Sequence, residues 1–422
     1  MVGRTEQVVD ERDDLQLERP APTRVGPVPG SRAQRRAKAR ARRRRSRAVV
    51  LLACAFMLVV VGGLGFGIKK WLNRSELAPD YNGPGGKEVV IQVKTGDTAD
   101  QIAQQMAKKD VTASAAAFYE AAVANDQMDK LQPGYYAIPT EISGKRAVDK
   151  LVDPSSRVGH VLLTEGRQLH DSTDVNTHAR KDGIYTKIAE ASCYGTGGDK
   201  KCITYDELNT AGASPDLKSL GVPDWALDAV SKVPDHDRQL EGLIPSGTWD
   251  FDPTATPTQI LRQLVSEGAS TYEKAGILEQ TPDVPLNPYQ KLIAASLVER
   301  ESLPPDFAKV ARVILNRLAV NRPLEFDSTV NYALERTEVA TTDADRAKVT
   351  PWNTYAMPGL PATPIASPSV PALEAIEKPA PGNWLYFVTV DKQGTTLFTA
   401  DYDEHLRNID RAKQSGILDS GR

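Results

Sequence analysis

The chain has 422 residues, of which 40% are hydrophobic and 25% are charged. This length suggests two or three domains of the usual size of about 150 residues, and this composition excludes a wholly disordered chain. Three cysteines and five histidines are too few for a zinc-finger array or for a small protein held together by a disulfide framework.

The net charge of −3 conceals a strong asymmetry along the chain. Residues 1–47 contain 14 Lys or Arg and 6 Asp or Glu, a net charge of +8, which leaves −11 for the remainder. Ten of these basic residues lie between Arg32 and Arg47, and an uncharged stretch of 21 mostly apolar residues, 48–68, follows directly. Such a stretch is long enough for a transmembrane helix, and the basic tract before it has the positive-inside pattern.

We therefore expect a single-pass protein of the cell membrane, with a disordered cytoplasmic tail and an extracytoplasmic remainder. Two alternatives are open. Residues 48–68 could belong to a cleaved signal peptide with an unusually long basic region, and the basic tract could bind nucleic acid. The position of the basic tract directly before the apolar stretch favours the membrane interpretation, with lipid and not nucleic acid as the partner.

An extracytoplasmic location bears on the state of Cys193 and Cys202, which are separated by the eight residues YGTGGDKK. In an oxidising space such a pair predicts a disulfide, and closing so short a loop stabilises the fold by roughly 2–3 kcal/mol. No residues with the spacing of a zinc site accompany the pair, so we expect neither a metal nor another cofactor.

Folded sequence begins after a linker at 69–87. Residues 89–93 predict a strand, 95–98 a turn, and the spacing of Ile102 and Met106 a helix. A turn and a second strand follow at 131–136. The order of strand, Gly-Asp-Thr turn and helix resembles the opening of a LysM-like module, a small unit that often binds peptidoglycan glycans.

A second strand–turn–helix unit begins at His160, and the stretch from Gly183 to about Asp237 is expected to be polar and rich in loops. The Asp-His-Asp run at 235–237 is interpreted as a solvated turn. The sequence has no nucleophile elbow, phosphate loop, dinucleotide fingerprint or His-Glu-x-x-His motif, which excludes most hydrolases, kinases and metalloproteases.

Residues 287–305 contain a predicted buried helix, which starts at Pro288 and ends before Pro304 and Pro305. Its residues are small or apolar around most of the circumference, yet it ends in Glu299, Arg300, Glu301 and Ser302. Successive helical residues are about 100° apart, so Glu299 and Glu301 point in different directions and cannot both face one cleft.

The succession of LIAASLVERES, KVARVILNRL, LEFDSTVNYAL, NTYAMPGLPATPIASPS and NWLYFV resembles the YceG-like family, the membrane-anchored endolytic murein transglycosylases called MltG. The resemblance covers residues 88–410, and its specific part is 240–410. It implies an α+β fold with a single N-terminal transmembrane helix, a LysM-like subdomain and a catalytic domain of helices with a small sheet. The expected segments are a tail (1–47), the transmembrane helix (48–68), a linker (69–87), the LysM-like subdomain (88–155), a connecting subdomain with the cysteine loop (156–239) and the catalytic domain (240–415).

The resemblance places the catalytic carboxyl at Glu301, because the Glu301–Ser302 pair matches the family's Glu-Ser or Glu-Thr step. Glu299 matches an accompanying acid that is expected to be structural. Asp327 matches the Asp of the segment Leu-Gln-x-Asp-Pro-Thr, from which Glu325 and Ser328 depart.

Asn353, Thr354 and Tyr355 match a loop that contacts the glycan. The substrate-binding set is therefore expected to comprise Glu299, Ser302, Asp327, Asn353, Thr354 and Tyr355. Thr396 stands where the family has a histidine and is assigned no role. His405 matches a later histidine, for which packing and function stay open.

The expected activity is endolytic cleavage of the MurNAc–GlcNAc bond of nascent peptidoglycan strands, which leaves 1,6-anhydro-MurNAc and limits strand length. Glu301 would donate a proton to the leaving oxygen and then accept one from the sugar's own 6-hydroxyl, so no second carboxylate is needed. The alternatives are a hydrolytic muramidase with Asp327 as the second carboxylate and a non-catalytic glycan-binding scaffold. Glycan strands are the expected partner, with peptidoglycan synthases or division proteins as candidate protein partners.

Overall fold

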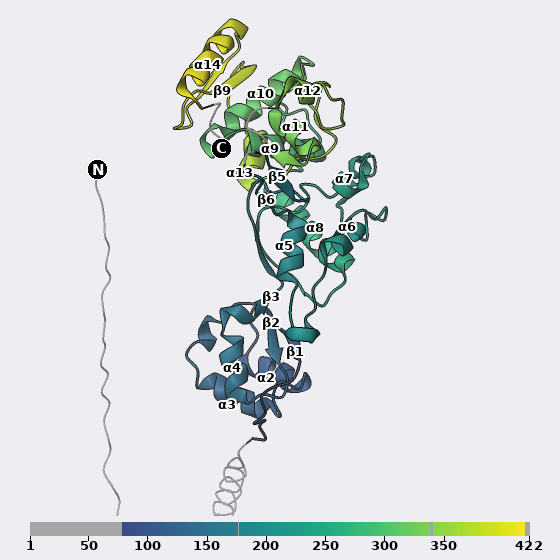
Figure 1. The fold of residues 1–422 in the computed structure, drawn as a ribbon, viewed down its shortest axis with the longest axis vertical. Helices are drawn as coiled ribbons and strands as arrows, with labels where there is room; N and C mark the ends of the chain where they lie inside the picture. The colour runs from purple at the N-terminus through teal and green to yellow at the C-terminus, as the bar shows by residue number, and fades with distance from the viewer. Residues whose placement is uncertain (1–77, 176, 338–340, 418–422) are drawn as a thin grey trace, which may run out of the picture. The chain divides into compact units, whose positions relative to one another are not determined.

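The computed structural model describes residues 78–175, 177–337 and 341–417. These residues form thirteen α-helices and four small sheets, which Figure 1 labels in chain order. The first sheet has the strand order β1–β2–β3, and both of its pairs are antiparallel. Its strands are β1 (Glu88–Val93), β2 (Gly134–Pro139) and β3 (Arg157–Val158).

Three helices pack with this first sheet around a core of its own, which includes Ile91, Met106, Phe118 and Ile138. They are α2 (Ala99–Lys108), α3 (Ala115–Val123) and α4 (Gly144–Leu151). Each begins where a serine or threonine side chain accepts a hydrogen bond from the first turn, because the first N–H groups of a helix have no partner inside the helix. The strand predicted at 89–93 is thus confirmed as β1.

The next part of the chain contains two more small sheets. One pairs β4 (His160–Leu163) with β7 (Gly247–Asp250) in antiparallel register, Leu163 opposite Gly247. The other has the order β6–β5–β8, in which β5 pairs with β6 antiparallel and with β8 parallel. Its strands are β5 (Ser172–Asp174), β6 (Arg180–Lys181) and β8 (Arg336–Thr337).

The stretch from 183 to 237, expected to be mostly loops, contains three short helices, so this expectation is wrong. They are α5 (Ile184–Ala191), α6 (Tyr205–Gly212) and α7 (Asp224–Val230). Each has only seven or eight residues, too few to show a clear apolar period in a polar sequence. Their apolar side chains, such as Ile188, Leu208 and Val230, are buried in the main core. A disulfide joins Cys193 and Cys202 between α5 and α6.

Several of the remaining helices pack against α9 (Pro288–Glu301), which is buried from Tyr289 to Val298. Asn287 and Gln290 form a reciprocal capping box at its start. The helix packs against α10 (Phe307–Ala319), α11 (Asp327–Ala333) and α13 (Val370–Glu377), whereas α8 (Pro257–Lys274) packs against α6 and α12 (Asp343–Arg346) against α11. The chain ends with the antiparallel hairpin of β9 (Tyr386–Thr389) and β10 (Thr396–Thr399), followed by α14 (Tyr402–Ser415).

The predicted fold class and location need correction. We expected an α+β fold with a single transmembrane helix and a single-pass membrane protein, but no helix in the described part of the chain is long and apolar enough to cross a membrane. The apolar helix α9 has 14 residues and spans about 21 Å, less than the roughly 30 Å of a hydrocarbon core. α8 has 18 residues but is amphipathic. Residues 48–68, where the span was predicted, lie outside the described residues.

Candidate active site

The candidate site is built around the carboxyl-terminal end of α9. The helix ends because Ser302 adopts an extended backbone (φ −150°, ψ 172°) and two prolines follow Leu303. The last turn therefore carries Glu299, Arg300 and Glu301 at the end of a buried helix. The Ser302 hydroxyl donates to the Val298 carbonyl oxygen over 3.1 Å, which satisfies one of the last carbonyls of α9.

Glu301 is half-buried, and the loss of water around its carboxyl raises the pKa of this group above its usual range. The negative charge of Asp327 raises this pKa further, while Ser328 and the Arg300 guanidinium oppose the rise. The Ser328 hydroxyl is buried beside this carboxyl. Such an environment favours a protonated carboxyl, which is the form required of a general acid.

Glu299, two residues earlier, has a different environment. Its Oε2 accepts hydrogen bonds from the Ser369 backbone N–H (3.0 Å) and hydroxyl (2.6 Å). Ser369 is the N-cap of α13, so Glu299 ties the end of α9 to the start of α13. These contacts assign Glu299 a structural task, and its expected place in the substrate-binding set has no support in this geometry.

Arg300 is oriented by the loop that follows β4. Its Nη1 donates to the Gly166 carbonyl oxygen over 3.3 Å. Burial lowers the pKa of the Arg300 guanidinium, while the carboxylates of Glu301, Glu241 and Glu299 favour its charged form. Arg300 therefore adds positive charge beside the candidate acid without forming an ion pair of short distance among the described residues.

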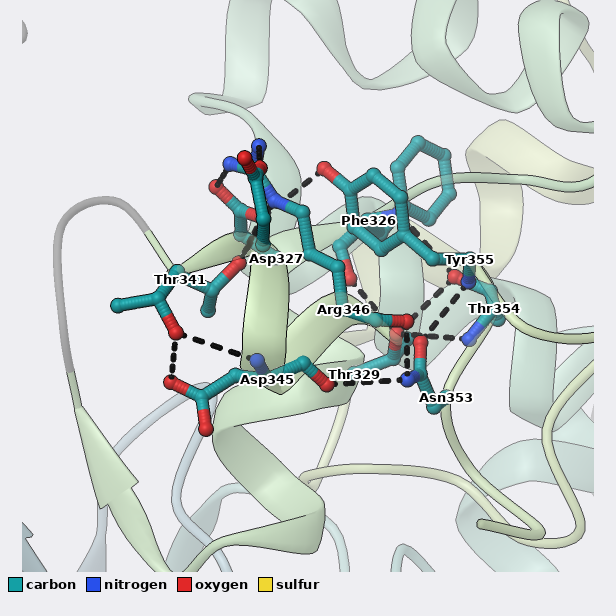
Figure 2. Close-up of polar contacts among 11 residues, drawn as sticks. Phe326, Asp327, Thr329, Thr341, Asp345, Arg346, Asn353, Thr354 and Tyr355 are labelled. Carbon is teal, nitrogen blue, oxygen red and sulfur yellow. Dashed lines mark hydrogen bonds and ion pairs between the residues drawn. The ribbon is translucent and has the colours of Figure 1, made fainter. Parts of the chain in front are cut away.

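Asp327, the first residue of α11, is the centre of a polar network shown in Figure 2. Its Oδ1 accepts hydrogen bonds from the hydroxyls of Thr341 (2.5 Å) and Tyr355 (2.9 Å) and from Arg346 Nε (3.2 Å). Its Oδ2 accepts from Arg346 Nη2 over 3.2 Å. Because four donors contact this carboxylate, Asp327 is held in place and its charge is balanced by Arg346.

Tyr355 contributes both its hydroxyl and its ring to this network. The Arg346 guanidinium lies over the ring, 5.0 Å from its centroid, a cation–π contact. Burial and the Asp327 carboxylate raise the pKa of the Tyr355 hydroxyl far above its usual value. Tyr355 therefore stays a hydrogen-bond donor at every physiological pH.

Asn353 and Thr354 were expected to contact the glycan, but the structure buries both, with 1% and 0% exposure. The Asn353 amide donates to the carbonyl oxygens of Arg346 (2.9 Å) and Lys348 (2.5 Å) and accepts from the Tyr355 N–H (2.9 Å). The Thr354 hydroxyl accepts from the Phe326 N–H over 3.1 Å. Both residues thus hold Tyr355 and the start of α11 in place, as Figure 2 shows.

Sequence reasoning missed Arg346 and Thr341, the partners of Asp327, and also Glu241. Arg346 and Thr341 lie in a polar segment that carries no apolar period, so no pattern pointed to them. Glu241 is fully buried, and its carboxylate accepts from the Leu169 N–H and the Tyr332 hydroxyl, each over 3.1 Å. Burial raises its pKa to about 7. The sequence feature that could have pointed to Glu241 is the Leu-Glu-Gly motif at 240–242.

The hairpin β9–β10 adds an aromatic wall near Asp327. The ring of Phe387 lies 6.0 Å from the ring of Phe326, the residue before Asp327. Phe387 also stacks on Phe398, with 5.8 Å between the ring centroids. The Thr396 hydroxyl is hydrogen-bonded to that of Thr389 across the hairpin. His405 stacks on Tyr386 at 4.8 Å, and burial lowers its pKa, so packing accounts for this histidine.

Together these residues provide one carboxyl of raised pKa, one fixed carboxylate with its arginine, and a tyrosine hydroxyl. Among the described residues, no group of three or more His, Cys, Asp or Glu side chains could hold a metal ion. Glu301 and Asp327 are brought near each other from two different helices, α9 and α11. This arrangement suits acid–base chemistry on a polar substrate.

Comparison with known proteins gives consistent matches. The profile of the YceG-like family matches residues 91–411. An endolytic murein transglycosylase of Bacillus subtilis (strain 168) is 27% identical over 322 residues, which are 75% of this chain and 82% of that protein. An endolytic murein transglycosylase of Streptococcus pneumoniae serotype 2 (strain D39 / NCTC 7466) is 24% identical over 177 residues, 40% of this chain and 32% of that protein. The crystal structure of the yceG-like protein lmo1499 from Listeria monocytogenes is 22% identical, with a TM-score of 0.48, and the match covers 76% of this chain and 99% of that one.

Proposed function

This chain belongs to the YceG-like family, and from that membership and from the geometry around Glu301 we propose that it is a peptidoglycan lytic transglycosylase. The relatives that carry the name endolytic murein transglycosylase support the class of enzyme. The proposed substrate is the glycan strand of nascent peptidoglycan. The proposed reaction breaks the bond between MurNAc and GlcNAc within a strand, which limits strand length.

In the first step, the protonated Glu301 carboxyl gives its proton to the oxygen that leaves with GlcNAc, and the bond between this oxygen and C1 of MurNAc breaks. Positive charge develops at C1 in this step. The raised pKa of Glu301 supports this step, because a carboxyl of ordinary pKa would be almost fully ionised at neutral pH.

In the second step, the ionised Glu301 accepts the proton of the 6-hydroxyl of the same MurNAc, and that oxygen forms the new bond to C1. The product is a 1,6-anhydro ring, water is not consumed, and Glu301 is again protonated. Tyr355 and the Asp327 carboxylate would orient the sugar and offset the positive charge at C1, because both are fixed before substrate binds.

The observation that carries this proposal is the difference between the two carboxylates at the site. Burial and a like-charged neighbour favour the protonated form of Glu301, whereas Asp327 accepts four hydrogen bonds, two of them from its ion-pair partner Arg346. A fixed Asp327 carboxylate suits an electrostatic role beside the positive charge at C1. A hydrolytic muramidase could use the same carboxylate as its second acid, so the products of the reaction distinguish the two activities.

The test is product analysis by mass spectrometry. The full-length chain is incubated with uncrosslinked glycan strands, and the released fragments are expected to end in 1,6-anhydro-MurNAc. Fragments with reducing MurNAc ends would instead indicate a muramidase. Strand binding without any release would indicate a glycan-binding scaffold. Glu301→Gln is the matched control and should release no fragments.

A further inference from the structure

A groove distinct from the Glu301 site lies between α8 and β7. Its cavity has a volume of about 780 Å³. We call it the α8–β7 groove; it is lined by Ser246, Gly247, Thr248, Trp249, Asp250, Gln263, Ser266, Glu267, Ser270, Thr271 and Lys274. The α8 residues recur at spacings of three and four, so they share one face of the helix. That face is about 16 Å long from Gln263 to Lys274.

The lining of the α8–β7 groove is polar and nearly balanced in charge. Five of its residues are Ser or Thr, whose hydroxyls both donate and accept hydrogen bonds. The Asp250 carboxylate is paired with Arg157 and His160, each over 2.9 Å. The Gln263 amide donates to Glu267 over 3.0 Å. Hydroxyl and amide groups match the hydroxyl and N-acetyl groups of a polysaccharide backbone.

An apolar surface accompanies these polar groups. Leu162 lies directly opposite Thr248 in the β4–β7 pair and is 62% exposed. Trp249, the next residue, is buried, and its indole N–H donates to the Pro245 carbonyl oxygen over 3.0 Å. A sugar ring presents both hydroxyl groups and an apolar face of C–H groups, and Leu162 with the Thr248 hydroxyl opposite it offers a partner for each at the edge of the groove.

The strand β4, which pairs with β7 of the α8–β7 groove, leads into a loop that contacts the catalytic helix. Gly247 pairs with Leu163, the last residue of β4. Gly166 follows Leu163 by three residues, and its carbonyl oxygen accepts the hydrogen bond from Arg300, the neighbour of Glu301. At the other end of β7, Asp250 pairs with Arg157 of β3 in the first sheet. A linear polymer leaving the Glu301 site along β4 would therefore meet this groove.

We propose that the α8–β7 groove binds the N-acetylhexosamine backbone of the glycan strand at a distance from the bond that is cleaved. This inference rests on the proposed function for the identity of the polymer. A stem peptide fits less well, because its carboxylates lie close together and would call for several basic side chains, whereas the sugar backbone presents mainly hydroxyl and N-acetyl groups and Lys274 is the one basic residue of the lining.

The test measures strand binding in the absence of cleavage. Full-length Glu301→Gln is titrated with long glycan strands from which the stem peptides have been removed. Ser270→Trp and Thr248→Trp are each added to this variant, because both side chains are exposed and a tryptophan there fills the groove from one wall. We expect each to raise the Kd about tenfold. Arg262→Trp, an exposed position on α8 outside the groove, is the matched control and should leave the Kd unchanged.

The same tryptophan variants in the active protein should raise KM for long strands about tenfold and leave kcat nearly unchanged, with thermal melting as the check on folding. Failure of the proposed function has a different signature, since the wild-type chain would then release no anhydro-ended fragments. Equal Kd values for all variants, no binding by Glu301→Gln, or binding only to strands that keep their stem peptides would each overturn the groove proposal.

Discussion

The hydroxyl of Tyr355 donates a hydrogen bond of 2.9 Å to the carboxylate of Asp327, a residue 28 positions earlier in the chain. Arg346 contacts both partners, through an ion pair with Asp327 and through its position over the Tyr355 ring. Three residues from three segments thus fix one negative charge near Glu301. That charge is one cause of the raised pKa of Glu301.

Replacing Asp327 by asparagine should lower the pKa of Glu301, because a like-charged neighbour is removed. The activity of Asp327→Asn should therefore decline at a lower pH than that of the wild type, on the alkaline side of its pH profile. Tyr355→Phe removes the hydroxyl but keeps the charge of Asp327, so it serves as the control. The measurement is the initial rate of fragment release between pH 4 and 9, and coinciding alkaline limbs in Asp327→Asn and wild type would contradict the argument.

In the wild type itself, the rate of cleavage should be highest at low pH and should fall as the pH rises through the pKa of Glu301. The sign follows from the first step, in which only the protonated carboxyl can donate. Because burial raises this pKa, activity should persist well above the pH at which an exposed glutamate is ionised. A rate that instead increases as the pH rises through this range would show that the ionised form acts first.

Glu301→Gln should lower the rate by at least about 10⁴-fold, since general acid–base catalysis contributes about 10²- to 10⁴-fold and one residue serves both steps. Glu299→Gln should keep most of its rate per folded molecule. It should lose about 1 kcal/mol of stability, because a charge-assisted hydrogen bond to Ser369 becomes a neutral one. Rates and urea unfolding are measured for both variants. A folded but inactive Glu299→Gln beside an active Glu301→Gln would reverse the assignment.

Glu241 should make stability depend on pH. Its pKa is raised to about 7 in the folded protein, from an ordinary value of 4.5, so the unfolded chain loses this proton first as the pH rises. The contribution of Glu241 to stability is therefore present below pH 4.5 and is lost between pH 4.5 and about 7, by about 3 kcal/mol. Glu241→Gln should flatten this part of the curve in urea unfolding experiments. If the free energy of unfolding changes with pH equally in the wild type and in Glu241→Gln, Glu241 is not the source of this pH dependence.

Lys291 and Glu377 form an ion pair between α9 and α13 at 2.8 Å, and both residues are buried. Lys291→Met alone should cost about 3–5 kcal/mol, because it leaves the Glu377 carboxylate buried without its cation. Adding Glu377→Leu should recover most of this loss, since two apolar side chains of similar size need no partner. Urea unfolding of the single and double variants measures the coupling energy between the two residues. If the losses of stability in the two single variants add up in the double variant, Lys291 and Glu377 act independently of each other.

The helices that form the site could be predicted because their signals are local. Asn287, Pro288 and Gln290 mark the start of α9, and the prolines after Leu303 mark its end, so the sequence located the helix to within a few residues. The segment KVARVILNRL, one of those that carry the family resemblance, lies within α10. The short helices α5 to α7 could not be found, because buried contacts with distant residues stabilise them.

The polar network of the site depends on contacts between residues far apart in sequence. Glu299 and Ser369 are separated by 70 positions, and Asp327 and Arg346 by 19. Nothing in the residues themselves distinguishes Arg346 from the other exposed arginines of the chain. For the same reason, Asn353 and Thr354 matched the family's glycan loop by position, whereas their burial became visible only once the loop was folded.

The place of Glu301 at the carboxyl-terminal end of α9 has an electrostatic consequence. The peptide dipoles of a helix sum to about half a negative charge at this end. An ionised carboxyl in the last turn is therefore repelled by the helix that carries it, by roughly 0.3–1 kcal/mol. After its proton has left, the Glu301 carboxylate faces the negative pole of α9, which strengthens it as a base. The same helix end would thus hold the proton before the first bond breaks and help to recover one as the new ring closes.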